Sequence, residues 1–368
     1  MLSIGIVGLP NVGKSTLFNA LTKKSVSCAN YPFCTIDPSI GIVAVPDERI
    51  WKLSKFSNSA KTIPAVIEFV DIAGLVRGAS KGEGLGNKFL ANIREVDAIL
   101  EIVRIFPAKN EGDEIIHVMG GVDPLRDIEI INLELILADL ETVMKRRSNL
   151  SREIKKGEKE AIIEDKALEK IEKALEKENL ANTVEFEEIE KNKVQMLNLL
   201  TLKPFIYGLN RQGGSCILSQ INSEEFKKLT DYIESKGSRY VIIDAKIEEE
   251  LKDFTKEEKK IFRKELGEED DGINDLIKES YKLLNLENYF TTGEDETRAW
   301  TIKKGSTAPV AGLAIHTDFK DKFIRADVIN WEELLNAGSY AEARSKGKVR
   351  TEGKQYIVKD GDVIEFKI

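Results

Sequence analysis

The stretch GLPNVGKST at residues 8–16 decides the fold of this chain. It follows an apolar run at residues 4–7, and a helical pattern of apolar residues comes after it. The stretch matches GxxxxGK[ST], in which backbone N–H groups and a helix N-terminus surround phosphates. In that motif the lysine meets the β- and γ-phosphate oxygens and the hydroxyl binds Mg²⁺, so we expect these roles for Lys14 and Ser15. The other loop residues expected to contact the nucleotide are Asn11, Val12, Gly13 and Thr16.

A second motif follows residues 62–70, a mostly apolar run that we expect to be a strand. This motif, DIAG at residues 71–74, is a DxxG pattern at the place of a Walker B acid. Asp71 is therefore predicted to reach Mg²⁺, usually through a water molecule. The alternative is an Asp that caps a turn after a strand, and the preceding P-loop motif favours the metal role.

Two loops have the features of nucleotide switches. Residues 30–38 contain two prolines that oppose regular structure, and Thr35 lies where a first switch supplies a ligand to Mg²⁺ and the γ-phosphate. The glycine-rich residues 75–86 would form the second switch. A plain turn and a flexible linker are the respective alternatives.

The residue directly after DxxG bears on the rate of hydrolysis. Ras-like enzymes have a glutamine there that orients the attacking water, and this chain has Leu75. We therefore expect slow intrinsic turnover that a monovalent cation or a docking partner increases.

Length and composition exclude several classes of protein. With 368 residues, of which 42% are hydrophobic and 32% charged, the chain is an ordinary globular protein of two or three domains. The net charge of −8 argues against binding nucleic acid through bulk charge. The sequence contains no membrane-spanning stretch, and its three cysteines form no CxxC pair, so we expect a cytoplasmic protein with reduced thiols and no membrane partner. Cys34, beside the first switch, is either redox-sensitive or inert.

The motifs together resemble the YchF subfamily of Obg-related P-loop proteins, the Obg-like ATPases. The resemblance extends through GASKGEGLGN at residues 78–87, IIHV at 115–118, TLKP at 201–204 and RAWTI at 298–302. It implies an α/β fold: a P-loop domain with a mostly parallel sheet (1–121 and 198–281), a helical coiled-coil arm (122–197) and a small α+β TGS domain of β-grasp type (282–368). It also implies Mg²⁺-dependent hydrolysis of ATP in preference to GTP, and association with the ribosome, including ribosomal RNA. A monomer is expected.

The base pocket departs from the pattern of the family. The guanine-reading NKxD motif is replaced in the family by NxxE, and residues 210–213 of this chain read NRQG. The resemblance implies base contacts from the Asn210 side chain and the Arg211 backbone. Gly213 offers no carboxylate, which gives guanine selection little support. A GTPase of Obg type stays one alternative, and a slow nucleotide-sensing module that binds RNA or the ribosome is another.

Two further roles follow from the resemblance. His117, in the IIHV string, is the candidate for orienting water in place of the missing glutamine, since a neutral imidazole can do so. A structural histidine is the alternative. Asn11 is a candidate ligand for a potassium ion.

The middle of the chain reads as a helical arm. Apolar residues follow helical spacing from residue 123 to 150, and four of them fall seven apart, as in a heptad seam: Ile154, Ala161, Leu168 and Leu175. A returning helix is expected through Phe186, Ile189 and Leu197. The basic residues near the start of the arm, among them Arg146 and Arg147, are candidates for contact with RNA phosphates. A solvated helical face is the alternative for this charge run.

The last segment, residues 282–368, has short β-like runs separated by glycine turns, which is typical of a small α+β module. It resembles the TGS domain, a module that contacts RNA or ribosomes in related proteins. His316 lies within the resembling string IHTDF, and we interpret it as a structural histidine.

Overall fold

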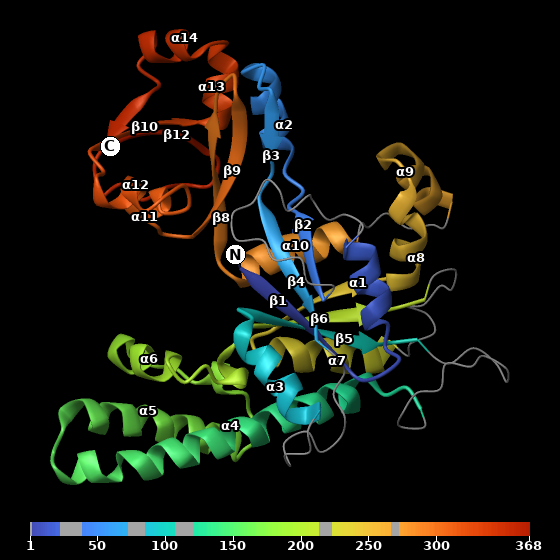
Figure 1. The fold of residues 1–368 in the computed structure, drawn as a ribbon. Helices are drawn as coiled ribbons and strands as arrows, with labels where there is room; N and C mark the ends of the chain where they lie inside the picture. Colours follow the sequence, from blue (N-terminus) through green and yellow to red (C-terminus); the bar gives the residue numbers. More distant parts are fainter. Residues whose placement is uncertain (1, 23–38, 73–84, 107–120, 213–222, 266–271) are drawn as a thin grey trace. The chain divides into compact units, whose positions relative to one another are not determined.

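The computed structural model describes residues 2–22, 39–72, 85–106, 121–212, 223–265 and 272–368 (Figure 1). These residues divide into two compact units. The second unit contains Ile42–Ile67 and Ile277–Ile368, and the first contains the other described residues. A six-stranded sheet is centred in each unit.

The first sheet has the strand order β2-β4-β1-β5-β6-β7, and its pairings from β4 to β7 are parallel. Its strands are β1 (Ser3–Val7), β2 (Ile40–Ala44), β4 (Val66–Asp71), β5 (Ala98–Arg104), β6 (Phe205–Asn210) and β7 (Arg239–Ile243). Every residue of β1, β5 and β6 is buried, as expected for the central strands of a parallel sheet with both faces covered. The predicted α/β fold with a mostly parallel sheet is confirmed.

Helices connect these strands and follow them. They are α1 (Lys14–Thr22), α3 (Leu85–Glu95), α7 (Ser223–Ser235), α8 (Ala245–Glu250), α9 (Lys256–Glu265) and α10 (Gly272–Leu283). Because the strands are parallel, the segments that follow β1, β4, β6 and β7 leave the same edge of the sheet. Ligands of open α/β sheets bind at this edge. None of the helices in the described part of the chain is long and apolar enough to cross a membrane.

The arm consists mainly of α4 (Pro124–Lys155) and α5 (Lys159–Leu175), which lie side by side (Figure 1). Asp123 begins α4 by accepting a hydrogen bond from the Arg126 N–H at 3.1 Å, and proline occupies the first turn, where no N–H is needed. At about 1.5 Å per residue, α4 is roughly 48 Å long.

The predicted position of the return is wrong. The chain turns back at residues 156–158, where Gly157 has a φ of 78° that other residues rarely adopt. Ala161, Leu168 and Leu175 are buried on α5 as the heptad predicted, but Ile154 lies on α4, before the turn. The segment expected to return forms only the short helix α6 (Glu188–Gln195), which packs on α5.

Ion pairs join the two long helices of the arm. Arg146 donates to both carboxylate oxygens of Glu164, at 2.6 and 2.9 Å. Arg147 pairs with Asp165 at 2.8 Å and also with Glu172. These two arginines, expected to be available for RNA phosphates, are therefore held by carboxylates of α5.

The second sheet has the order β11-β10-β12-β8-β9-β3. Its strands are β3 (Lys61–Ile63), β8 (Leu286–Thr292), β9 (Glu296–Lys303), β10 (Arg325–Asn330), β11 (Arg350–Glu352) and β12 (Asp362–Lys367). Its helices are α2 (Glu48–Phe56), α11 (Ala308–Gly312), α12 (Asp318–Asp321), α13 (Trp331–Ala337) and α14 (Tyr340–Ser345). One core cluster contains Tyr289, Ala311, Phe323 and Val328. The C-terminal β-rich module is confirmed.

Two elements from the N-terminal part of the chain, α2 and β3, also belong to this unit, although their sequence lies within the expected P-loop domain (1–121). Polar contacts hold them there: Ser59 donates to the Gly293 carbonyl at 2.6 Å, and Arg49 bonds to Asp360 at 2.6 Å. The Arg49 guanidinium also lies 5.2 Å from the centre of the Phe290 ring. These partners are more than 200 positions apart in the chain, so no local pattern indicates them.

We expect Asp139→Ala to destabilise the protein. This fully buried side chain on α4 accepts hydrogen bonds from the Leu200 N–H, the Thr201 N–H and the Thr201 hydroxyl at 3.0, 2.7 and 2.6 Å. Buried donors that lose their acceptor cost about 1–3 kcal/mol each, so urea unfolding should show a loss of about 3 kcal/mol or more. Glu141→Ala, an exposed change on the same helix, is the matched control. Equal unfolding free energies for the two variants would contradict the prediction.

Candidate nucleotide-binding site

The P-loop connects β1 to α1 and has an unusual backbone. Gly8 has a φ of 152° and Gly13 a φ of 100°, and Asn11 also has a positive φ of 64°. A Cβ atom on Gly8 would lie 2.6 Å from the Ile102 carbonyl oxygen, and one on Gly13 would lie 2.2 Å from the Asn210 side-chain nitrogen. Glycine is therefore required at both positions, because the positive φ angles disfavour other residues and because a side chain would collide with neighbouring atoms.

Lys14 lies at the start of α1, and its side chain turns back over the loop. Its Nζ donates to the carbonyl oxygens of Gly8 and Leu9, at 2.9 and 3.0 Å. Burial lowers the pKa of Lys14, and the nearby carboxylate of Asp71 partly offsets this effect. The ammonium group is thus held against the loop that carries the phosphate-binding motif.

Asp71 ends β4, and Ile6 of the neighbouring strand β1 lies opposite it in the parallel register. Burial raises the pKa of Asp71, and the charge of Lys14 acts in the opposite direction. The two predicted residues are therefore brought together at the edge of the sheet. Ser15 lies in the first turn of α1 and is exposed, as is Asn11 in the loop.

Asn210 joins three segments of the first unit. Its side chain is 4% exposed; Nδ2 donates to the Val12 carbonyl at 2.8 Å, and Oδ1 accepts from the Ala245 N–H at 3.0 Å. The adjacent Arg211 N–H donates to the Ile243 carbonyl at 2.8 Å. Asn210, predicted to contact the base, also holds the P-loop against the segment that follows β7.

Residues 244–246, at the start of that segment, correspond in the resemblance to the final base-side loop of the family, with no role given to a particular side chain. Asp244 begins α8, and its Oδ1 accepts from the Ile247 N–H at 3.0 Å. The cap places the Ala245 N–H where it can donate to Asn210. An aspartate directly after an apolar strand was the signal for the helix start, but nothing local indicated the bond to Asn210.

Several predicted positions lie outside the described residues, namely the first switch (30–38, with Cys34 and Thr35), residues 75–84 of the second switch, His117 and Gly213. Their roles stay predictions. Among the described residues, oxygen donors suited to Mg²⁺ are present in the Ser15 hydroxyl and the Asp71 carboxylate, which the motif pairs with the phosphates.

Comparison with known proteins places this site in a family. Residues 3–134 match the family model described as 50S ribosome-binding GTPase, and residues 286–368 match the model of the YchF-GTPase C-terminal region, described as a protein of unknown function. The ribosome-binding ATPase YchF of Bacillus subtilis is 51% identical, with 100% of this chain and 99% of the relative covered. The chain belongs to the YchF family.

Other YchF proteins agree with this assignment. The ribosome-binding ATPase YchF of Haemophilus influenzae is 47% identical, and the alignment covers 99% of this chain and 98% of that relative. The solved structure of the Schizosaccharomyces pombe YchF GTPase is 40% identical in sequence and superposes with a TM-score of 0.85. The alignment covers 100% of this chain and 97% of that chain. The resemblance inferred from the motifs is thereby confirmed.

Substitution of Gly13 tests the packing of this YchF P-loop. Gly13→Ala should abolish nucleotide binding, because a Cβ atom 2.2 Å from Asn210 Nδ2 would force either the P-loop or the Asn210 side chain to move. Binding of a fluorescent ATP analogue would measure the loss. Gly353→Ala is the matched control, since a Cβ there meets no atom within 4 Å. Wild-type affinity in Gly13→Ala would disprove the tight contact.

Proposed function

We propose that this chain is a ribosome-binding P-loop ATPase that hydrolyses ATP to ADP and phosphate in a Mg²⁺-dependent reaction. The observation that carries the proposal is the position of Lys14, whose Nζ lies on the P-loop carbonyls beside Asp71. The names of the bacterial relatives, which are called ribosome-binding ATPases, support the same conclusion.

The proposed chemistry is the attack of water on the γ-phosphorus, with ADP as the leaving group. Lys14 would neutralise charge on the β- and γ-oxygens, and the loop from Asn11 to Thr16 would donate its N–H groups to the phosphates. Ser15, Thr35 and Asp71 would hold Mg²⁺, Asp71 through a water molecule, and the metal would supply positive charge that neutralises the charge developing on the phosphates. Asn11 would hold a potassium ion, and His117 would orient the water.

Asn210 and Arg211 would lie against the base. Both side-chain groups of Asn210 already form hydrogen bonds, with the Val12 carbonyl and the Ala245 N–H. Its contribution to the base pocket would therefore include holding the P-loop in place beside the end of β6. The partners proposed are ATP and the ribosome, including its RNA, and the proposed location is therefore the cytoplasm. A monomer is proposed.

Replacing Lys14 tests the reaction. Lys14→Ala should lower ATP turnover by about 10²–10³-fold, the usual effect of removing one group that stabilises the transition state. Phosphate release should be measured with and without ribosomes, with Lys354→Ala, an exposed change, as the control. Wild-type turnover that stays negligible even with ribosomes would favour a slow nucleotide-sensing module.

His117→Ala with unchanged turnover would remove His117 from the mechanism.

GTP hydrolysis is the second candidate, because the solved fission-yeast relative is called a GTPase. We expect calorimetric titration of nucleotide-free protein to show tighter binding of ATP than of GTP, since residue 213 is a glycine and supplies no carboxylate to guanine. Each tenfold preference corresponds to about 1.4 kcal/mol. Tighter binding of GTP would make the GTPase the leading function.

A further inference from the structure

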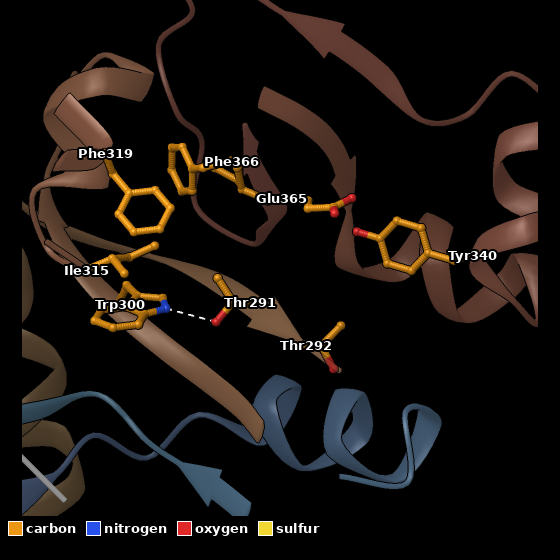
Figure 2. Close-up of a pocket in the computed structure, with 9 residues that line it drawn as sticks. Thr291, Thr292, Trp300, Ile315, Phe319, Tyr340, Glu365 and Phe366 are labelled. Carbon is orange, nitrogen blue, oxygen red and sulfur yellow. Dashed lines mark hydrogen bonds between the residues drawn. The ribbon is translucent and has the colours of Figure 1, made fainter. Parts of the chain in front are cut away.

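Two polar groups that line a pocket of about 520 Å³ in the second unit have partners within the chain (Figure 2). Trp300 Nε1 donates to the Thr291 hydroxyl at 2.9 Å, and the Glu365 carboxylate pairs with Lys367. The charge of the carboxylate in this pocket is therefore compensated by a cation. The carboxyl group of Glu101, in the first unit, has no such compensation.

Glu101 lies in the middle of β5, is 0% exposed, and has the apolar Val7 opposite it on β1. No group of the described residues forms a hydrogen bond with either of its carboxylate oxygens. Burial raises the pKa of Glu101 well above its usual value, and the negative charge of Asp127 raises it further. Burying an unpaired carboxylate is so unfavourable that such a group usually takes up a proton.

The polar groups around Glu101 come from three other elements. Tyr207 of β6 lies directly opposite it in the parallel register and is also fully buried. Asn132 and Asp127 belong to α4, which packs against β5, and both are at least 95% buried. Tyr232 of α7 acts on the pKa of Tyr207 and lies near the Asn132 side chain. The long helix of the arm therefore meets the central sheet at a buried polar cluster.

The unpaired atoms of this cluster are balanced when Glu101 carries a proton. The Asn132 carboxamide lies close to the Tyr207 hydroxyl, but Tyr207 Oη and Asn132 Oδ1 form no hydrogen bond of regular geometry with a described residue. With an ionised Glu101 there are three unpaired acceptor atoms and one unpaired hydroxyl. A protonated Glu101 supplies an O–H donor for Asn132 Oδ1 and keeps an acceptor for the Tyr207 hydroxyl.

Of the two buried acids, Asp127 is the better placed to carry a charge. It lies in the first turn of α4, where the helix dipole stabilises an anion, and its Oδ1 is 3.4 Å from Arg126 Nη2. Glu101 lies within a strand, away from any helix end. Because like charges that are buried near each other do not both ionise readily, the proton belongs on Glu101.

We propose that Glu101 forms a proton-dependent connection between α4 and the central strands β5 and β6. With the proton bound, neutral Glu101 joins Asn132 of the arm to Tyr207 of the sheet. When the proton leaves at alkaline pH, the buried charge repels Asp127, and the first half of α4 separates from the sheet. The inference goes beyond the proposed function and holds whether the chain hydrolyses ATP or GTP.

Urea unfolding of the full chain over a series of pH values tests the proton. The pKa of Glu101 is higher in the folded than in the unfolded chain, so its stabilisation is fully present below the unfolded pKa and is lost as the pH rises to the folded pKa. Within this window the folding equilibrium constant of the wild type, relative to that of Glu101→Gln, should fall about tenfold per pH unit. Glu141→Gln, an exposed change on α4, is the matched control and should give a constant ratio. A constant ratio for Glu101→Gln as well would overturn the proposal.

Infrared spectroscopy provides a test that does not require Glu101→Gln to fold. Wild-type protein labelled with ¹³C-glutamate should show the C=O stretch of a protonated glutamic acid at neutral pH. Burial also raises the pKa of Glu68, so Glu68→Gln is the second variant, and it should keep the band. A wild-type spectrum without the band, or loss of the band in Glu68→Gln, would contradict a protonated Glu101.

Hydrogen exchange tests the connection to the arm. Amides in the first half of α4 should lose protection at alkaline pH in the wild type but not in Glu101→Gln at the same pH, with α5 as the internal reference. A uniform loss of protection over the chain would mean that Glu101 affects only global stability, which overturns the proposal. So would protection that depends on K⁺ and is lost in choline, because a cation would then take the place of the proton. None of these measurements uses ATP turnover, so failure of the proposed function would leave them unaffected.

Discussion

The carboxamide of Asn210 is the contact on which the nucleotide site depends. It connects the P-loop, the end of β6 and the start of α8 through two buried hydrogen bonds, one donated and one accepted. An isolated glycine-rich loop has many conformations, and the two hydrogen bonds of Asn210 stabilise one of them. Because Gly13 lies so close to the Asn210 side chain, the spacing of the phosphate-binding motif also serves the packing at the carboxyl ends of the strands.

The parts of the fold that the sequence predicted are those with local causes. The P-loop, the strand before Asp71 and the apolar strands of the sheet each leave a pattern within about ten residues, because phosphate binding and burial act on neighbouring positions. The bond from Ala245 to Asn210 and the inclusion of α2 in the second unit depend on partners far along the chain. Nothing in the local pattern indicates such partners.

The arm shows how a correct pattern can still give a wrong position. The heptad spacing from Ile154 to Leu175 is real, but it runs across a turn that only Gly157 marks. The charged residues did not indicate the position of the turn either. The carboxylates of α5 are the ion-pair partners of Arg146 and Arg147 on α4 and do not form a separate surface. Asp139 fixes the base of the arm to the segment before β6, so the arm is attached to the strand that ends at Asn210.

The pairing of β3 with β9 also affects the order in which the chain folds during synthesis. Lys61 pairs with Glu296, so the ribosome must add some 235 residues after Lys61 before its partner exists. At about 5–20 residues per second this takes roughly 10–50 s, a long interval compared with the formation of local structure. Residues 61–63 therefore leave the ribosome early but reach their final sheet late, and the second unit can be completed only when almost the whole chain has been made.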